Sequence, residues 1–172
     1  MYYIKLLVVA LLFLSDGVYD YQMTDISGNQ INLSDFQGKK ILFVNTATNS
    51  EYVDQYASLE QLYQKYKDSL VIIATPSNSF GNEPDSNSDI KNFVDSQYNI
   101  HYILAAKSDV AGDSIPAVYQ WLTQKNLNQY FQNPVHGDFF KFLVTSNGEM
   151  IGIFAPSVDP MDSTLQTVIQ TQ

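Results

Sequence analysis

Apolar residues follow two different periods along this chain. Near-continuous apolar runs cover residues 41–44 (Ile-Leu-Phe-Val) and 70–74 (Leu-Val-Ile-Ile-Ala), and such runs are typical of strands buried on both faces of a sheet. Between the two runs, apolar and aromatic residues recur at three- and four-residue spacing, which predicts a helix. The residues of this stripe are Tyr52, Val53, Tyr56, Leu59, Leu62, Tyr63 and Tyr66. Strand, helix and strand in this order imply a parallel crossover.

Two hairpins flank the middle of the chain. Near the N-terminus, residues 19–24 and 30–33 are strand-like, and a Ser-Gly-Asn turn sequence lies between them. Near the C-terminus, residues 139–145 and 150–154 flank a Ser-Asn-Gly turn sequence. The alternation of side chains along a strand places Phe140 and Phe142 on one face and Phe139 on the other, and we expect all three to be mostly buried.

Further helices complete the pattern. Residues 85–98 look helical, with Ser88 as the expected N-cap. Pro116 and Pro160 each stand where a helix would open, and residues 100–104 form one more strand. The resulting order predicts an α/β fold with a mixed central sheet flanked by helices and an N-terminal β-hairpin, which is a thioredoxin-like arrangement.

The first seventeen residues have the shape of a secretory signal peptide. Residues 6–14 are all apolar and follow Lys5, and small and acidic residues end the run. The run is too short to cross a bilayer, which takes about 20 apolar residues, so we expect no stable membrane anchor. A buried core segment is the alternative. We therefore predict a signal peptide over 1–17, a single domain over 18–172, and an exported protein, periplasmic or secreted.

Composition removes several classes of function. The 172 residues include no cysteine, no arginine, nine lysines and eighteen acidic residues, for a formal charge of −9. No thiolate nucleophile, disulfide or cysteine-bound lipid is therefore available. Two histidines, His101 and His136, are too few for a three-histidine zinc centre, and we expect neither a metal nor another cofactor. The acidic charge and the missing arginines also argue against nucleic-acid binding.

Four segments in a fixed order resemble the glutathione peroxidases. They are residues 19–39, which end in Leu-Ser-Asp-Phe-Gln-Gly-Lys, residues 44–50 (Val-Asn-Thr-Ala-Thr-Asn-Ser), residues 76–84 (Pro-Ser-Asn-Ser-Phe-Gly-Asn-Glu-Pro) and residues 138–148 (Asp-Phe-Phe-Lys-Phe-Leu-Val-Thr-Ser-Asn-Gly). No single segment is decisive, but the ordered set is specific, and the resemblance covers essentially all of residues 19–169.

The resemblance implies a role in hydroperoxide reduction and in the response to oxidative stress. Members of this family use a cysteine or selenocysteine nucleophile that peroxide oxidises and that glutathione or a thioredoxin-like protein then reduces. The nucleophile lies in a tetrad with Gln, Trp and Asn. By motif position, the resemblance puts Ser50 at the nucleophile, Ser79 at the glutamine, Gly137 at the tryptophan and Asp138 at the asparagine. All four residues depart from the family pattern.

These departures predict a catalytically inactive homologue that serves as a binding or structural module. A serine hydroxyl has no oxidation state comparable to a sulfenic acid, so it does not carry two electrons from peroxide to thiol. We expect Ser50 to cap the helix that follows it. Two alternatives are a residual hydroperoxide-reducing enzyme of unfamiliar route and a hydrolase that uses Ser50 with His136 and Asp138.

Two further expectations follow from the resemblance. Family members that form tetramers do so partly through an inserted loop, and this chain has no clear extra segment of that kind, so we expect a monomer. Lys141 matches the family lysine that follows the tetrad asparagine, and we expect it to help pack the end of its strand. Glutathione or a thioredoxin-like protein is the partner that the resemblance implies.

Overall fold

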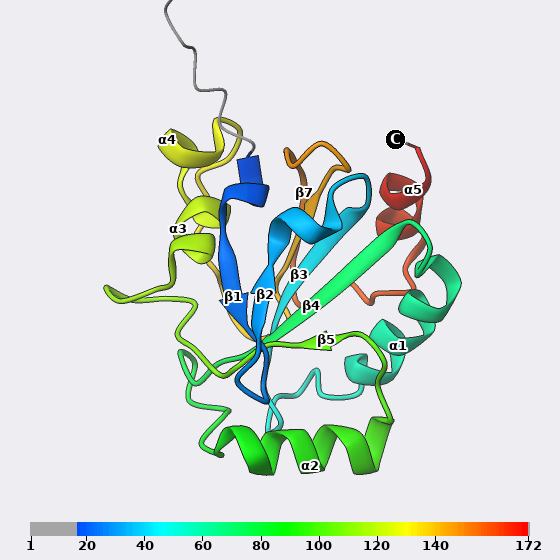
Figure 1. Cartoon of the computed structure of the whole chain (residues 1–172). Coiled ribbons are helices and arrows are strands. Elements are labelled where there is room, and N and C mark those ends of the chain that lie inside the picture. The colour runs from blue at the N-terminus through cyan, green and yellow to red at the C-terminus, as the bar shows by residue number, and fades with distance from the viewer. Residues whose placement is uncertain (1–16, 172) are drawn as a thin grey trace, which may run out of the picture.

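A mixed sheet forms the centre of the protein. The computed structural model describes residues 17–171, so the predicted signal peptide lies outside the described residues except for Gly17. The five-stranded sheet has the order β5-β4-β3-β6-β7 (Figure 1). Its strands are β3 (Lys40–Thr46), β4 (Leu70–Pro76), β5 (Ile103–Leu104), β6 (Lys141–Val144) and β7 (Met150–Phe154). Strands β3, β4 and β5 are parallel, whereas β6 and β7 pair antiparallel with their neighbours.

A separate antiparallel hairpin and several helices surround this sheet. The hairpin pairs β1 (Gln22–Thr24) with β2 (Gln30–Asn32). The helices are α1 (Gln55–Tyr66), α2 (Asn87–Tyr98), α3 (Ala117–Thr123), α4 (Lys125–Asn128) and α5 (Ser163–Gln170), with short 3-10 turns η1 (Gly17–Asp20) and η2 (Leu33–Phe36). This architecture confirms the predicted thioredoxin-like α/β fold with an N-terminal hairpin.

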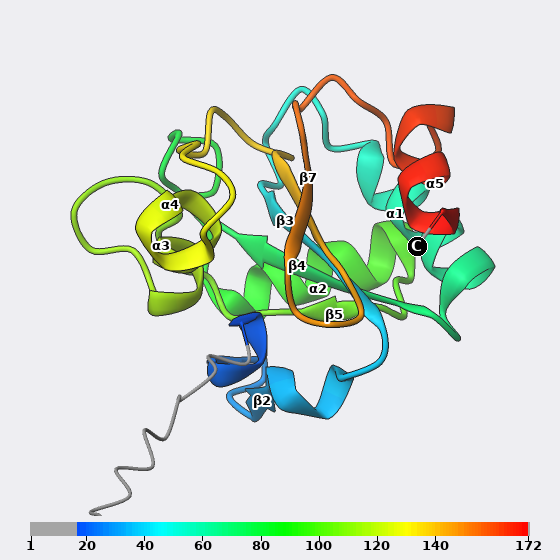
Figure 2. The same cartoon turned by 90° about the horizontal axis from the view of Figure 1, so that it is seen from above.

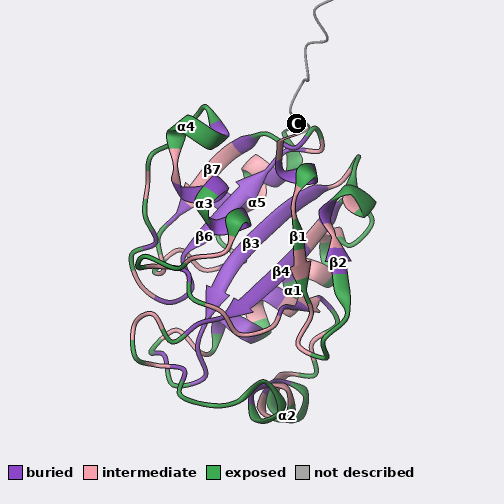
Figure 3. Cartoon of the chain, turned by 60° about the vertical axis from the view of Figure 1, so that its left-hand side comes forward, coloured by how far each residue is buried: buried purple, intermediate pink, exposed green. Residues whose placement is uncertain are grey.

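The sheet separates two hydrophobic cores, because successive side chains of a strand point to opposite faces. In β3, Ile41 and Phe43 enter the core under α3 and the N-terminal hairpin, and Leu42 enters the core under α1, α2 and α5. In Figure 2, α3 lies to the left of the strands, and α1 and α5 lie to the right. All seven residues of β3 are buried, as Figure 3 shows for the central strands. The near-continuous apolar runs therefore predicted the central strands correctly.

The aromatic residues around the start of β6 follow the predicted alternation. Phe140 and Phe142 pack in the core under α3, whereas Phe139 packs in the opposite core. The Phe139 ring meets the Tyr56 ring edge-on, with 5.3 Å between the centroids. All three phenylalanines are buried, which confirms the expectation of buried rather than surface aromatics.

Two helix starts differ from their predictions. Helix α2 begins at Asn87 and is capped by Ser86, whose hydroxyl accepts a hydrogen bond from the backbone N–H of Asp89. Ser88 was the expected cap, but it lies inside the first turn. Helix α5 is capped by Asp162 rather than opened by Pro160. In both cases a side-chain oxygen that reaches a free backbone N–H determines the start.

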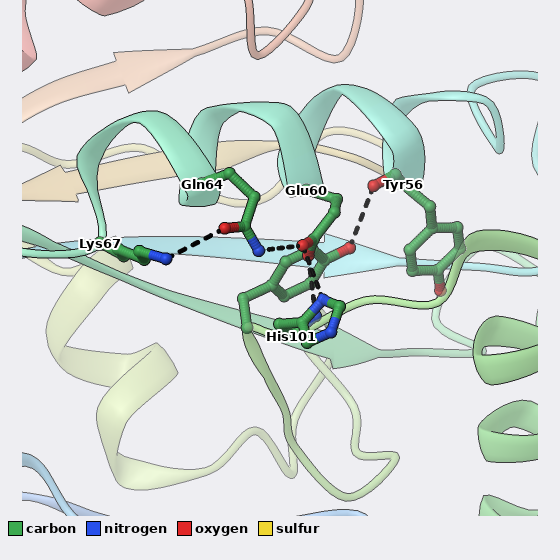
Figure 4. Close-up of polar contacts among 6 residues, drawn as sticks. Tyr56, Glu60, Gln64, Lys67 and His101 are labelled. Carbon is green, nitrogen blue, oxygen red and sulfur yellow. Dashed lines mark hydrogen bonds and ion pairs between the residues drawn. The ribbon is translucent and has the colours of Figure 1, made fainter.

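Helix α1 is tied to the chain that leads into β5 (Figure 4). The Glu60 carboxylate accepts hydrogen bonds from the backbone N–H of His101 at 2.7 Å and contacts its ring Nδ1 at 2.8 Å. Gln64 donates to the same carboxylate at 2.7 Å, and Lys67 donates to Gln64 at 3.2 Å. The two contacts between Glu60 and His101 therefore hold α1 beside β5, the edge strand of the sheet, and the other two lie within α1 and its C-terminal end.

Candidate functional site

Ser50 lies in the loop between β3 and α1. Its side chain is largely buried, with 6% of the residue exposed. The hydroxyl accepts a hydrogen bond from the backbone N–H of Tyr52 at 3.2 Å, and the carbonyl of Ser50 accepts from the N–H of Val53. Helix α1 begins only at Gln55. Ser50 therefore caps a turn that precedes the helix, and not the helix itself as expected.

A buried glutamate fixes this loop. The Glu83 carboxylate is fully buried and accepts hydrogen bonds from the backbone N–H and the hydroxyl of Thr48, both at 2.8 Å. Burial raises the pKa of the Glu83 carboxyl, and the two bonds from Thr48 oppose that rise. The backbone N–H of Asn49 also donates to the carbonyl of Asn82. These hydrogen bonds therefore hold the loop that contains Ser50 against the loop that contains Asn82.

Gly137 and Asp138 approach Ser50 from the segment before β6. Asn45, at the end of β3, donates its side-chain amide to the Gly137 carbonyl at 3.0 Å, and its own carbonyl accepts from the N–H of Phe139. Asp138 is 4% exposed. One of its carboxylate oxygens accepts from the Asn82 amide at 2.6 Å. Its other oxygen, Oδ1, has no hydrogen-bond partner among the described residues.

These segments enclose a cavity of about 490 Å³ at the end of the sheet. The cavity is lined by residues Asn49, Ser50, Glu51, Tyr52, Phe80, Asn82, His136, Gly137, Asp138 and Pro156. Three of the four residues predicted for the site, Ser50, Gly137 and Asp138, are therefore brought together. They come from two loops far apart in the sequence. Because β6 pairs antiparallel with β3, the loop after β3 and the segment before β6 lie at the same end of the sheet.

The structure does not bring Ser79 into this cavity. The Ser79 hydroxyl accepts hydrogen bonds from the backbone N–H groups of Val110 and Ala111, at 3.0 and 3.2 Å, and so fastens its loop to the following one. Asn82, three residues later, lines the cavity instead. Sequence reasoning missed Asn82, although its side chain offered the relevant signal: it is an amide, like the glutamine that the motif position requires.

Gly137 has a backbone conformation that side chains disfavour. Its φ is +109°, and a Cβ added there would stand 3.6 Å from Cγ of Pro156. Space is therefore available for a small group, but any residue other than glycine would be strained. A tryptophan at this position needs a different local backbone.

Lys141 binds backbone next to the cavity. The side chain is fully buried, and its ammonium donates to the carbonyls of Phe139 at 2.7 Å and Pro156 at 3.5 Å. Gln55 donates to the same Pro156 carbonyl at 2.7 Å. Burial lowers the pKa of Lys141 to about 7, opposed by the charge of Asp159. Lys141 thus fastens the end of its strand to the chain that follows β7, in line with the expected packing role.

His136 is exposed and does not complete a catalytic triad. Its ring meets the edge of Phe140, with 6.0 Å between the centroids. Within residues 17–171, no hydrogen bond joins His136 to Ser50 or to Asp138. A serine nucleophile needs a base within about 3 Å to be activated. The arrangement therefore lacks the contacts that the hydrolase alternative requires.

The described part of the chain has neither a cluster of metal-ligating side chains nor a helix that could span a membrane. Between residues 17 and 171, no three His, Asp or Glu side chains gather closely enough to hold a metal ion. In the same range, no helix has the length and apolar character needed to span a membrane.

Solved structures resemble this fold over most of the chain. The crystal structure of Trgpx in apo form is 29% identical, covers 89% of this chain and 92% of its own, and superimposes with a TM-score of 0.70. A thiol:disulfide interchange protein of the thioredoxin family from Chlorobium tepidum is 12% identical, covers 87% and 92%, and has a TM-score of 0.64. The second likeness concerns the fold alone.

Sequence comparisons agree with the first of these likenesses. A glutathione peroxidase-like peroxiredoxin of Schizosaccharomyces pombe is 36% identical over 155 residues, which are 88% of this chain and 98% of the relative. A glutathione peroxidase of Lactococcus lactis is 32% identical over 144 residues, 83% of this chain and 91% of the relative. The family profile named glutathione peroxidase matches residues 18–123. The chain therefore belongs to the glutathione peroxidase family.

Proposed function

We propose that this protein keeps the glutathione peroxidase scaffold but does not reduce hydroperoxides, and that it serves as a binding or structural module. One observation is the main support: the residue at the motif position of the nucleophile is Ser50, it lines the cavity, and the chain contains no cysteine at all. The family's reaction needs a nucleophile that peroxide oxidises and a thiol then restores.

The surroundings of Ser50 support the same conclusion. The Asp138 carboxylate lines the same cavity, and a negative charge there disfavours any anionic nucleophile. The Ser50 hydroxyl already takes part in a turn with Tyr52, and no base contacts it among the described residues. A serine alkoxide without a base is scarcely populated near neutral pH.

Three further features belong to this proposal. The apolar run at residues 6–14 supports export to the periplasm or the cell exterior after removal of a signal peptide. The protein acts as a monomer. Glutathione or a thioredoxin-like protein, the reductants of the family, would be bound without turnover if either is a partner.

A coupled peroxidase assay tests this proposal. With hydrogen peroxide or cumene hydroperoxide, and with either the glutathione or the thioredoxin reducing system, the purified wild type should consume peroxide no faster than the free thiol does. Turnover by the wild type above that background would overturn the proposal.

A pair of cysteine variants separates the scaffold from the chemistry. Ser50→Cys combined with Asp138→Asn puts a thiol inside the cavity and removes the opposing charge, and it should gain peroxide consumption. Ser79→Cys combined with Asp138→Asn puts a thiol outside the cavity, at a position where the serine hydroxyl accepts hydrogen bonds from two backbone N–H groups. This variant should not gain peroxide consumption. Gly137 is left unchanged in both because its backbone conformation disfavours a side chain.

A further inference from the structure

We propose that the open edge of β4 binds an extended acidic peptide of another protein, which adds a strand to the central sheet. This surface lies away from the Ser50 cavity, and among the described residues no side chain lines both. Because β3 and β4 are parallel, the start of β4 and the loop after β3 lie at opposite ends of the sheet. The inference therefore goes beyond the proposed function and does not depend on the loss of peroxidase chemistry.

The edge of β4 is only partly covered. On one side, β3 pairs with all seven residues of β4. On the other side, β5 is short (Figure 1), and in the described structure it pairs with Ile73 and Ala74 alone. The Ala74 carbonyl accepts from the N–H of Ala105 on this side. Because alternate residues of a strand direct their backbone groups to the same neighbour, Leu70 and Ile72 direct theirs to the open edge. Such groups are a template for a further strand.

A cleft of about 370 Å³ lies where that further strand would run. Its lining includes Leu70, Val71 and Ile72 at the start of β4. Of its aromatic residues, Phe36 packs against the core under α3, whereas Tyr63 of α1 packs against the opposite core. The cleft therefore opens at the edge of the sheet, between the two layers. An extended chain bound there would direct alternate side chains toward these two layers.

The charge of the cleft selects an acidic peptide. Its lining includes Lys39, Lys67 and His101, and one acid, Asp35. Within residues 17–171, neither lysine forms an ion pair, because each donates to a neutral oxygen at 3.2 Å. His101 already contacts Glu60 (Figure 4). A chain with twice as many acidic residues as lysines thus places two lysines without a carboxylate partner beside one open strand edge. Acidic side chains of a bound peptide would supply the missing partners.

Three heptapeptides that differ only in charge test this inference. They alternate valine, which favours strands, with glutamate, glutamine or lysine. In calorimetric titrations at physiological ionic strength, the glutamate peptide should bind about tenfold or more tightly than both others. The formal charge of −9 by itself favours the lysine peptide, so the expected order is specific to the cleft. Equal affinities, or no binding of the glutamate peptide, would overturn the inference and leave the lysines as mere protection of the edge.

Backbone methylation separates strand addition from charge alone. In an added strand, only every second N–H of the peptide faces β4. N-methylation of one set of alternate residues in the glutamate peptide should therefore abolish binding, and methylation of the other set should not. Equal effects of both sets would reject strand addition. Hydrogen exchange of the complex should slow at the N–H groups of Leu70 and Ile72, and protection confined to other segments would reject the site.

Lysine variants locate the charge preference. Lys39→Gln combined with Lys67→Gln should remove the preference for the glutamate peptide. Lys91→Gln combined with Lys125→Gln changes the net charge equally at lysines outside the cleft and should leave the preference in place. If the first double variant does not fold, Lys67→Gln alone, at an exposed position, should lower the preference. A preference that survives the loss of the cleft lysines rejects the site.

A second copy of the chain is the competing occupant of this edge. Sedimentation of the protein alone should give a monomer whose N–H groups at Leu70 and Ile72 exchange at the same rate at all protein concentrations. A dimer that slows the exchange of these two groups would assign the edge to a second copy and reject the acidic peptide.

Discussion

Lys141 and Glu83 are ionisable side chains buried beside the cavity, and burial favours the neutral form of each. Burial lowers the pKa of Lys141 to about 7 and raises the pKa of Glu83. Both side chains nevertheless hold backbone that surrounds the cavity. Glu83 binds the backbone N–H of Thr48, and Lys141 reaches the carbonyl of Pro156. At this scale, the shape of the cavity depends on two groups whose charge is sensitive to pH.

Lys141 should make the stability of the protein depend on pH. Its pKa is about 7 in the folded chain and near its usual 10.5 in the unfolded chain, so the unfolded chain binds more protons between these values. The free energy of unfolding therefore rises with pH from about 7 upward, by at most about 1.4 kcal/mol per pH unit, and this gain is lost as the pH falls back to about 7.

Urea unfolding measured between about pH 7 and pH 9 tests this dependence. Lys141→Met should flatten the slope, and Lys125→Met, at an exposed lysine, should leave it unchanged. The same slope in the wild type and in Lys141→Met would contradict the assignment.

At the scale of elements, side-chain oxygens decide where α2 and α5 begin, whereas α3 begins directly after Pro116, as expected. Ser86 caps α2 and Asp162 caps α5, because each accepts a hydrogen bond from a backbone N–H in the first turn. Ser50 plays a related part in the turn before α1. A pattern of apolar residues indicates the body of a helix, but its start depends on which oxygen reaches a free N–H.

Ser86 and Ser88 offer a matched test of this rule. Ser86→Ala removes the cap of α2 and should lower the free energy of unfolding by about 1 kcal/mol. Ser88→Ala, two residues on, leaves the bond from Asp89 to Ser86 in place and should have a clearly smaller effect. Urea unfolding of the two variants gives the comparison, and equal losses would contradict the assignment of Ser86 as the cap.

At the scale of the whole molecule, the acidic charge is independent of the predicted signal peptide. Removing residues 1–17 deletes one lysine and one aspartate, so the formal charge of the remaining chain stays at −9. The acidity is thus a property of residues 18–172 and not of the predicted signal peptide. Because the chain has no cysteine, its stability depends on the two hydrophobic cores and not on a disulfide.

Export can be tested on the full-length chain in a bacterial host. We expect the protein in the exported fraction, with an intact mass that corresponds to a start near residue 18. Replacing Val8 and Leu11 with aspartate interrupts the apolar run and should keep the protein inside at its full mass. An exported wild type that retains residues 1–17 would contradict the predicted cleavage.

Local patterns in the sequence were sufficient to predict the class of the fold and most of its elements. The apolar runs of β3 and β4, the alternation at Phe139, Phe140 and Phe142, and the turns of both hairpins all follow from local periodicity. Ser50, Gly137 and Asp138 were also found from motif position, and the structure brings them to one cavity. The strands, the alternation and the turns were predictable because each depends on residues close together in the chain, whereas the three site residues were predicted from the family resemblance.

The composition of the site, in contrast, depends on tertiary packing. This packing brought Asn82 to the cavity and turned Ser79 toward the loop at Val110, because backbone N–H groups from a distant segment bind the Ser79 hydroxyl. Within residues 17–171, it also left Oδ1 of Asp138 without a hydrogen-bond partner. Local patterns do not contain this information, since it depends on which segments the packing of the sheet brings side by side.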